Sequence, residues 1–124
     1  MEYVCYQSEE YVFSVFNADY GPFGVRIKSD TFSGSYVFCV ERENLEHDII
    51  KLKELINTLE GIYRLNDMDS DSYIIFEMMK YGKLAIRGMI GGSYSDNYMV
   101  FGFEADQTLL TNFIESLTKI IYAK

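Results

Sequence analysis

The sequence has few of the side chains that most catalytic and metal sites use. Its 124 residues include one histidine, two cysteines, one proline and no tryptophan. A structural zinc site needs about four cysteine or histidine ligands, and Cys5 and Cys39 lie far apart in the chain. His47 stands between Glu46 and Asp48, and any Ser–His–Asp or Cys–His arrangement would depend on this one imidazole. We therefore expect no metal ion, no cofactor and no enzymatic activity.

Segments that direct a chain to or through a membrane are also missing. No run approaches the roughly 18–20 apolar residues that a membrane-spanning helix needs. The first ten residues, MEYVCYQSEE, have no basic start and no apolar centre, so they do not resemble a secretory signal peptide. Two cysteines are too few for a disulfide framework. These features together predict a cytoplasmic protein.

Basic residues are scarce relative to acids. The chain has 11 lysines and arginines against 19 aspartates and glutamates, a net charge of -8 at pH 7, and the excess of acids lies within residues 1–80. A field of this sign repels nucleic acids and anionic membranes and attracts basic proteins. The alternative is that the acids only keep the protein soluble.

Alternation of apolar and polar residues is frequent. It predicts strands over residues 10–17, 23–30, 33–41, 62–66, 72–80, 83–91 and 97–105. Apolar residues at steps of three and four predict amphipathic helices over 42–61 and 106–124. We expect Asn44 or a neighbour to cap the first helix, Gly61 to close it, and Asp106 to cap the second. The order βββα-ββββ-α predicts one α+β domain over residues 1–124. We expect a mainly antiparallel sheet of six to seven strands, with both helices packed on one face.

The segment NDMDSDSY, residues 66–73, places an aspartate at every second position, namely Asp67, Asp69 and Asp71. A calcium-binding EF-hand loop beginning at Asp67 would need glycine at its sixth position and glutamate at its twelfth. The sequence has Ser72 and Met78 there. Three acids in a polar turn are expected to stay solvated and ionised. The loop therefore displays negative charge, either to a partner or only to water.

Tyrosine is the most abundant aromatic residue, with 11 copies. Five of them stand in or beside expected turns: Tyr20, Tyr73, Tyr81, Tyr94 and Tyr98. Tyrosine is enriched among the residues that dominate protein interfaces, and acids beside aromatic rings suit a basic protein partner. The alternative is that these rings line strand edges and contact no partner. The candidate contacts, chosen for charge and loop position, are Glu9, Glu10, Asp19, Asp67, Asp69, Asp71, Tyr94 and Asp96.

Four strings in this order resemble the WapI-type immunity proteins of contact-dependent inhibition and related polymorphic toxin systems. They are LKELINTLEG (52–61), DSDSYIIFEM (69–78), GKLAIRGMIGGSY (82–94) and FGFEADQTLL (101–110). The resemblance implies a bacterial immunity protein that binds and neutralises a cognate toxin domain in the cytoplasm. The toxins of these systems are often nucleases, including tRNases. The resemblance assigns no residue to the interface.

Two other functions stay open at this point. One is a small-molecule-binding α+β domain that uses an aromatic-lined sheet pocket, and the other is a hydrolase without a recognisable motif that depends on His47. Exposed edge strands also leave the oligomeric state open, because such edges allow a dimer.

Overall fold

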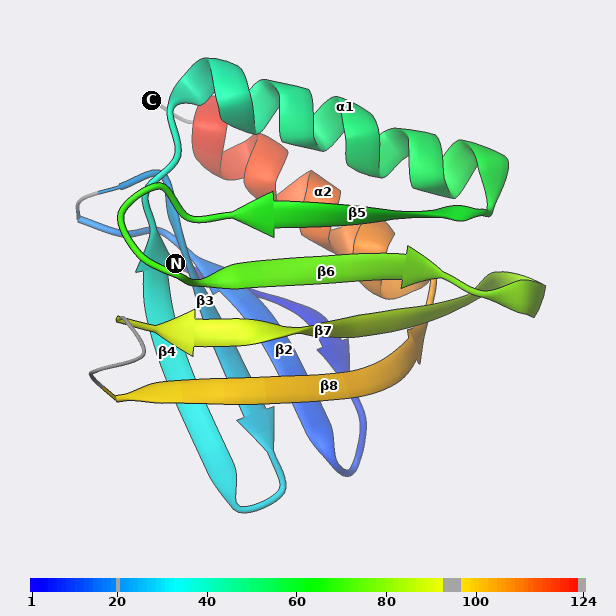
Figure 1. Ribbon diagram of the computed structural model, residues 1–124, viewed down its shortest axis with the longest axis horizontal. Helices are drawn as coiled ribbons and strands as arrows, with labels where there is room; N and C mark the ends of the chain where they lie inside the picture. Colours follow the sequence, from blue (N-terminus) through cyan, green and yellow to red (C-terminus); the bar gives the residue numbers. More distant parts are fainter. Residues whose placement is uncertain (20, 93–96, 123–124) are drawn as a thin grey trace.

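The computed structural model describes residues 1–19, 21–92 and 97–122, which form two antiparallel four-stranded sheets and two helices (Figure 1). The first sheet joins, in chain order, β1 (Glu2–Gln7), β2 (Tyr11–Phe16), β3 (Phe23–Ser29) and β4 (Phe32–Phe38). The second joins β5 (Gly61–Asn66), β6 (Tyr73–Met78), β7 (Lys83–Gly91) and β8 (Tyr98–Asp106). Helix α1 (Arg42–Thr58) connects the sheets, η1 (Lys80–Gly82) is a short 3-10 turn, and α2 (Thr108–Tyr122) follows β8.

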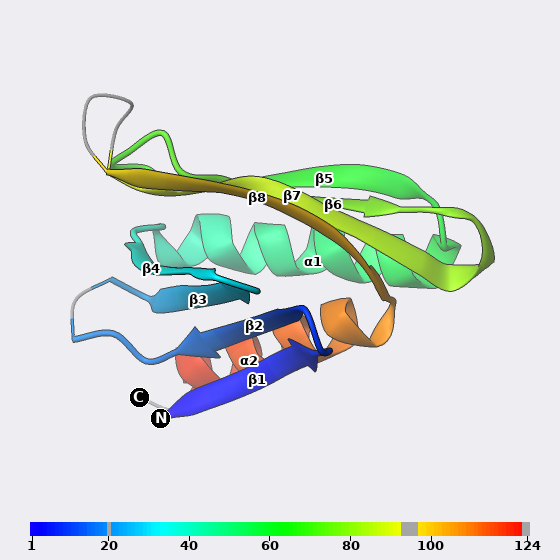
Figure 2. The same cartoon turned by 90° about the horizontal axis from the view of Figure 1, so that it is seen from below.

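The sheets lie one behind the other with their strands running in different directions (Figure 1). In Figure 2 the strands β5–β8 form one layer and β1–β4 lie on its other side, while Figure 1 shows α1 beyond β5. Helix α1 contacts β5 and α2, α2 contacts β1 and β2, and β4 contacts β7. Neither α1 nor α2 combines the length and apolar character that a helix crossing a membrane requires.

The predicted α+β class is confirmed, but the predicted single sheet of six to seven strands is wrong. β1 is a strand that the predicted order βββα-ββββ-α does not include. The helices also do not share one face of a sheet, because α1 packs beside β5 while α2 packs against the other sheet. Both sheets turn an apolar face inward, so one core is enclosed between two layers of strands.

Phe113 of α2 contacts both sheets. Its ring centroid lies 5.7 Å from that of Phe13 and 6.3 Å from that of Phe23, both in the first sheet. It lies 5.1 Å from the ring centroid of Phe76 in the second sheet. All four side chains are fully buried. One side chain of α2 therefore contacts apolar residues of both sheets.

The helix ends differ in part from the predicted caps. Glu41 stands at the N-terminal boundary of α1 and makes no side-chain cap, so Asn44 lies inside the helix. Leu59, with φ 57°, takes the left-handed position at the C-terminus, and Gly61, with φ 109°, opens β5. The predicted cap of α2 is confirmed, because the Asp106 carboxylate accepts the N–H of its first residue at 2.9 Å.

Candidate partner-binding surfaces

Three segments meet at one end of the molecule, which we call the loop end: residues 17–22 without residue 20, residues 39–41, and residues 67–72. The β2–β3 and β5–β6 connections both lie on the left in Figure 1. The N–H of Met68 donates to the carbonyl oxygen of Cys39 at 3.0 Å. A side chain at Gly21 would touch the sulfur of Cys39. The acidic β5–β6 loop is thus joined to the chain that enters α1.

The expectation that all three loop aspartates are solvated is wrong for Asp67, which is only 6% exposed. Its Oδ1 accepts the N–H of Cys39 at 2.7 Å, and its Oδ2 accepts the hydroxyl of Ser70 at 2.6 Å. Its own N–H donates to the carbonyl oxygen of Ser72 at 3.0 Å. Hydrogen bonds to a carboxylate are among the stronger ones in proteins. Asp67 therefore holds the loop in place and does not display charge.

Ser72 joins the same loop to the end of β7. Its hydroxyl is buried and donates to the carbonyl oxygen of Gly91 at 2.6 Å, while its N–H donates to Ser70 Oγ at 3.1 Å. Asp69 and Asp71 lie on this fixed backbone with their side chains exposed, as predicted. The sequence signal for the fixed loop is the Asp67–Ser70 spacing, since an aspartate and a hydroxyl residue often close such turns.

The eight candidate contacts do not form one surface. Asp19 lies in the β2–β3 loop, at the same end as Asp69 and Asp71. Glu9 and Glu10 are exposed in the β1–β2 turn, at the opposite end of β2. Tyr94 and Asp96 lie outside the described residues, as does Tyr20.

The other turn tyrosines differ in exposure. Tyr81 in η1 is 96% exposed. The ring of Tyr73 is covered by the guanidinium of Arg64, whose carbon lies 4.0 Å from the ring centroid. Elsewhere the hydroxyl of Tyr63 donates to the carboxylate of Asp48, and burial raises the pKa of both groups. Some tyrosines therefore pack against other side chains, and others expose their rings to solvent.

A second surface, which sequence reasoning missed, is the β8 groove, a hollow of about 500 Å³ between the β3–β4 turn and β8. Its residues include Phe32, which is 71% exposed, and Val100, which is 67% exposed. Both residues stand in alternating strands, and alternation does not tell which apolar residues extend past the edge of the facing sheet.

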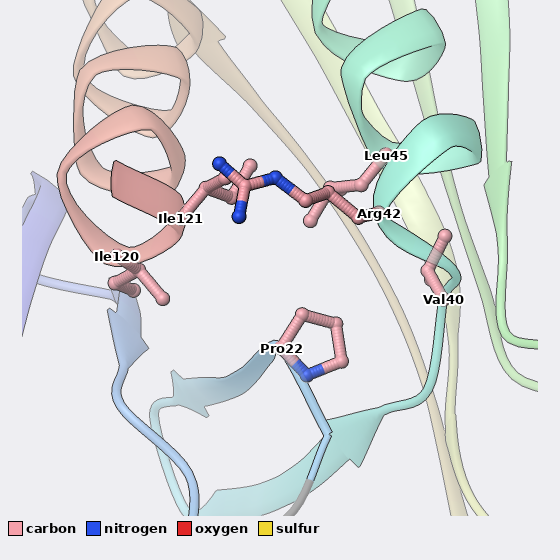
Figure 3. A pocket seen from close by; sticks show the side chains of 6 residues that line it. All are labelled: Pro22, Val40, Arg42, Leu45, Ile120 and Ile121. Atoms are coloured by element: carbon pink, nitrogen blue, oxygen red, sulfur yellow. The ribbon is translucent and has the colours of Figure 1, made fainter. Parts of the chain in front are cut away.

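The third candidate surface is a hollow between α1 and the C-terminal end of α2 (Figure 3). Its volume is about 180 Å³, and it is lined by Pro22, Val40, Arg42, Leu45, Ile120 and Ile121. The guanidinium of Arg42 crosses above it towards α2 (Figure 3) and also pairs with Glu46 at 3.2 Å. Pockets for drug-sized ligands usually measure about 300–1,000 Å³, so this hollow suits at most a small apolar group.

The groups with catalytic potential are dispersed. Burial raises the pKa of the Cys5 thiol to about 11 and also raises the pKa of Cys39, and the protonated thiol is a poor nucleophile. His47 is exposed on α1. Over the described ranges, no three histidine, cysteine or acidic side chains are grouped closely enough to hold a metal ion. Comparison with models of protein families, with curated proteins and with solved structures finds no match.

Proposed function

We propose that this protein is an immunity protein, a non-enzymatic inhibitor that binds a basic bacterial toxin domain in the cytoplasm. The observation that supports this most is the fixed acidic loop at the loop end. A buried carboxylate, Asp67, holds the backbone, while Asp69 and Asp71 stay exposed on it. A binding surface that is rigid before contact loses less conformational entropy on association. The family resemblance of four sequence strings points to the same role.

The charge distribution supports a basic partner. The chain has a net charge of -8, and Asp19 and Glu41 bring the exposed acids of the loop end to four. Complementary charge accelerates diffusional encounter and rejects wrong partners. Nucleases hold phosphates with lysine and arginine side chains, so a nuclease toxin has the kind of surface that these acids fit. Covering that surface inhibits the toxin without any chemistry by the inhibitor.

The experiment that tests the role is a growth rescue. The toxin domain encoded directly upstream is expressed in bacteria with and without this protein. We expect the toxin alone to stop growth, and co-expression to restore it through a complex that can be purified. Continued growth arrest in cells that contain the folded protein contradicts the proposed function.

A charge-reversal pair tests the loop. The double variant Asp69→Lys, Asp71→Lys should slow association with the toxin domain by about tenfold or more and make the rate less dependent on salt. The matched control is Glu60→Lys, Glu115→Lys, which changes the net charge equally at exposed positions outside the loop end. Stopped-flow kinetics measures both. Equal slowing by the two double variants contradicts a specific role of the loop.

A further inference from the structure

The outer edge of β8 is the last edge of the second sheet. β8 stands last in the order β5-β6-β7-β8, so in the described chain no strand pairs with its outer side. Every second residue of such a strand turns its N–H and C=O away from its neighbour. Edge strands are usually protected by lysine, proline or a bulge. The strand YMVFGFEAD has no lysine or proline, and its register with β7 is unbroken.

The other edges of the two sheets differ from β8. The edge of β5 lies against α1, and β1, which carries a bulge, lies against α2. β4 is shorter, with seven residues against nine in β8. The residue after β4, Cys39, is tied to Asp67 of the acidic loop. Among the described strands, β8 therefore offers the longest edge that pairs with no further strand.

The first sheet provides a floor beside this edge. In Figure 1 the β1–β2 and β3–β4 turns both extend below β8. Phe32 projects there with 71% of its surface exposed. Tyr11 stacks on Phe103 of β8 with ring centroids 4.5 Å apart, and Tyr6 lies 5.8 Å from the same ring. A strand added to β8 would thus place alternate side chains on an aromatic surface that is already formed.

The described residues that line the groove include no acid, but acids stand around it, and we call these its rim. Glu104 and Asp106 are exposed on the C-terminal half of β8. Glu10 directly precedes Tyr11, and its carbonyl oxygen accepts the N–H of Asp30 at 2.8 Å. Both of those side chains are exposed as well. Two bases of β7 stand opposite this strand in the register, Lys83 at Asp106 and Arg87 at Gly102, and Arg87 pairs with Glu77 at 3.0 Å. A strand that lies here meets more negative than positive charge.

We propose that β8 is a docking edge, and that an extended basic segment of the toxin domain adds to the second sheet as a further strand. This inference rests on the proposed function. The segment alternates apolar side chains, which face Phe32 and the aromatic floor, with lysine or arginine side chains, which face Glu104. Cross-strand pairs of opposite charge stabilise such pairing. A second copy of this chain fits less well, because it brings the same acids to the same rim.

Hydrogen exchange on the complex tests the inference directly. With the upstream-encoded toxin domain bound, alternate amides of β8 should exchange at least about tenfold more slowly, while the amides of β4 keep their rates. If the toxin domain binds and the β8 amides are unchanged, the inference is wrong and the proposed function stands. If the toxin domain does not bind, the proposed function fails.

A seven-residue peptide of alternating valine and lysine then tests the edge alone, with its backbone N-methylated form as the control. Slower exchange of the β8 amides with the unmodified peptide, but not with the N-methylated one, supports the docking edge. Equal exchange rates with both peptides overturn it.

Two matched variants give a second readout. Val100→Lys puts a cation beside the outer edge of β8. Ile62→Lys puts the same cation at an apolar position, 55% exposed, on β5, the strand at the other edge of the same sheet. We expect toxin affinity to fall by about tenfold or more for Val100→Lys and to change less than about twofold for Ile62→Lys. Equal affinities contradict the docking edge. A dimer of the free protein that only Val100→Lys dissociates would show that a second copy fills the groove, which also overturns the proposal.

Discussion

Asp67 is the residue on which the shape of the acidic loop depends. Its carboxylate accepts hydrogen bonds from the Cys39 backbone N–H and the Ser70 hydroxyl, and the residue is only 6% exposed. Asp69 stands two positions further on and is exposed. The two aspartates have the same chemistry and nearly the same place in the chain. They differ in what surrounds the carboxylate, and burial therefore separates a structural acid from an acid that a partner can contact.

This difference predicts unequal costs of substitution. Asp67→Ala leaves the N–H of Cys39 without its acceptor, and should lower the free energy of unfolding by about 2–3 kcal/mol. Asp69→Ala, the matched control, should change it by less than about 0.5 kcal/mol. Urea denaturation of both variants measures the two values. Similar small losses would show that Asp67 does not hold the loop.

Helix α2 is the element that joins the two sheets. Its side chain Phe113 contacts aromatic rings of the first sheet on one side and Phe76 of the second on the other. Period-two alternation in the sequence identifies most strands and the inward face of each one. It does not say which strands share a sheet, because an alternating strand pairs equally well with several neighbours. In the structure the division between the two sheets falls at α1, which separates β4 from β5 along the chain.

β1 shows a second limit of the sequence pattern. Its residues EYVCYQ are apolar or aromatic on both faces, and a bulge between Val4 and Tyr6 shifts the alternation. The solvation of Asp69 and Asp71 follows from residue type, whereas the burial of Asp67 depends on Cys39, 28 positions away. Exposure of Phe32 likewise depends on where the facing sheet ends. Contacts distant in sequence therefore decide what local patterns leave open.

The joining role of α2 predicts a large effect of truncating one ring. Phe113→Ala should lower the free energy of unfolding by about 3–5 kcal/mol, because it removes contacts with both sheets and leaves a cavity. Tyr81→Ala removes a ring that is 96% exposed and should cost less than about 0.5 kcal/mol. Thermal or urea unfolding compares them. A loss below about 1 kcal/mol for Phe113→Ala would contradict its central position.

Across the whole molecule, some exposed charges form ion pairs on the sheet faces, and others stand at the candidate contact sites. On the sheet faces cations pair with acids, as Arg87 does with Glu77 at 3.0 Å and Arg26 does with Glu2. The acids singled out as partner contacts lie at two places, in the turns of the loop end and around the β8 groove, where Glu104 and Asp106 stand on the strand itself. Under the proposed function, this layout would attract a basic protein over a distance and then bind it at surfaces of complementary shape. Steering of this kind makes association fast and strongly dependent on salt.

The most direct test is the association rate with the upstream-encoded toxin domain, measured by stopped flow from low to high ionic strength. We expect a stable complex whose association rate falls by at least about tenfold between roughly 0.02 and 0.5 M salt, because screening shortens the reach of the acids. Its dissociation rate should change much less. A complex that forms at the same rate across this range, or no complex at all, would contradict the claim that displayed negative charge recruits a basic partner.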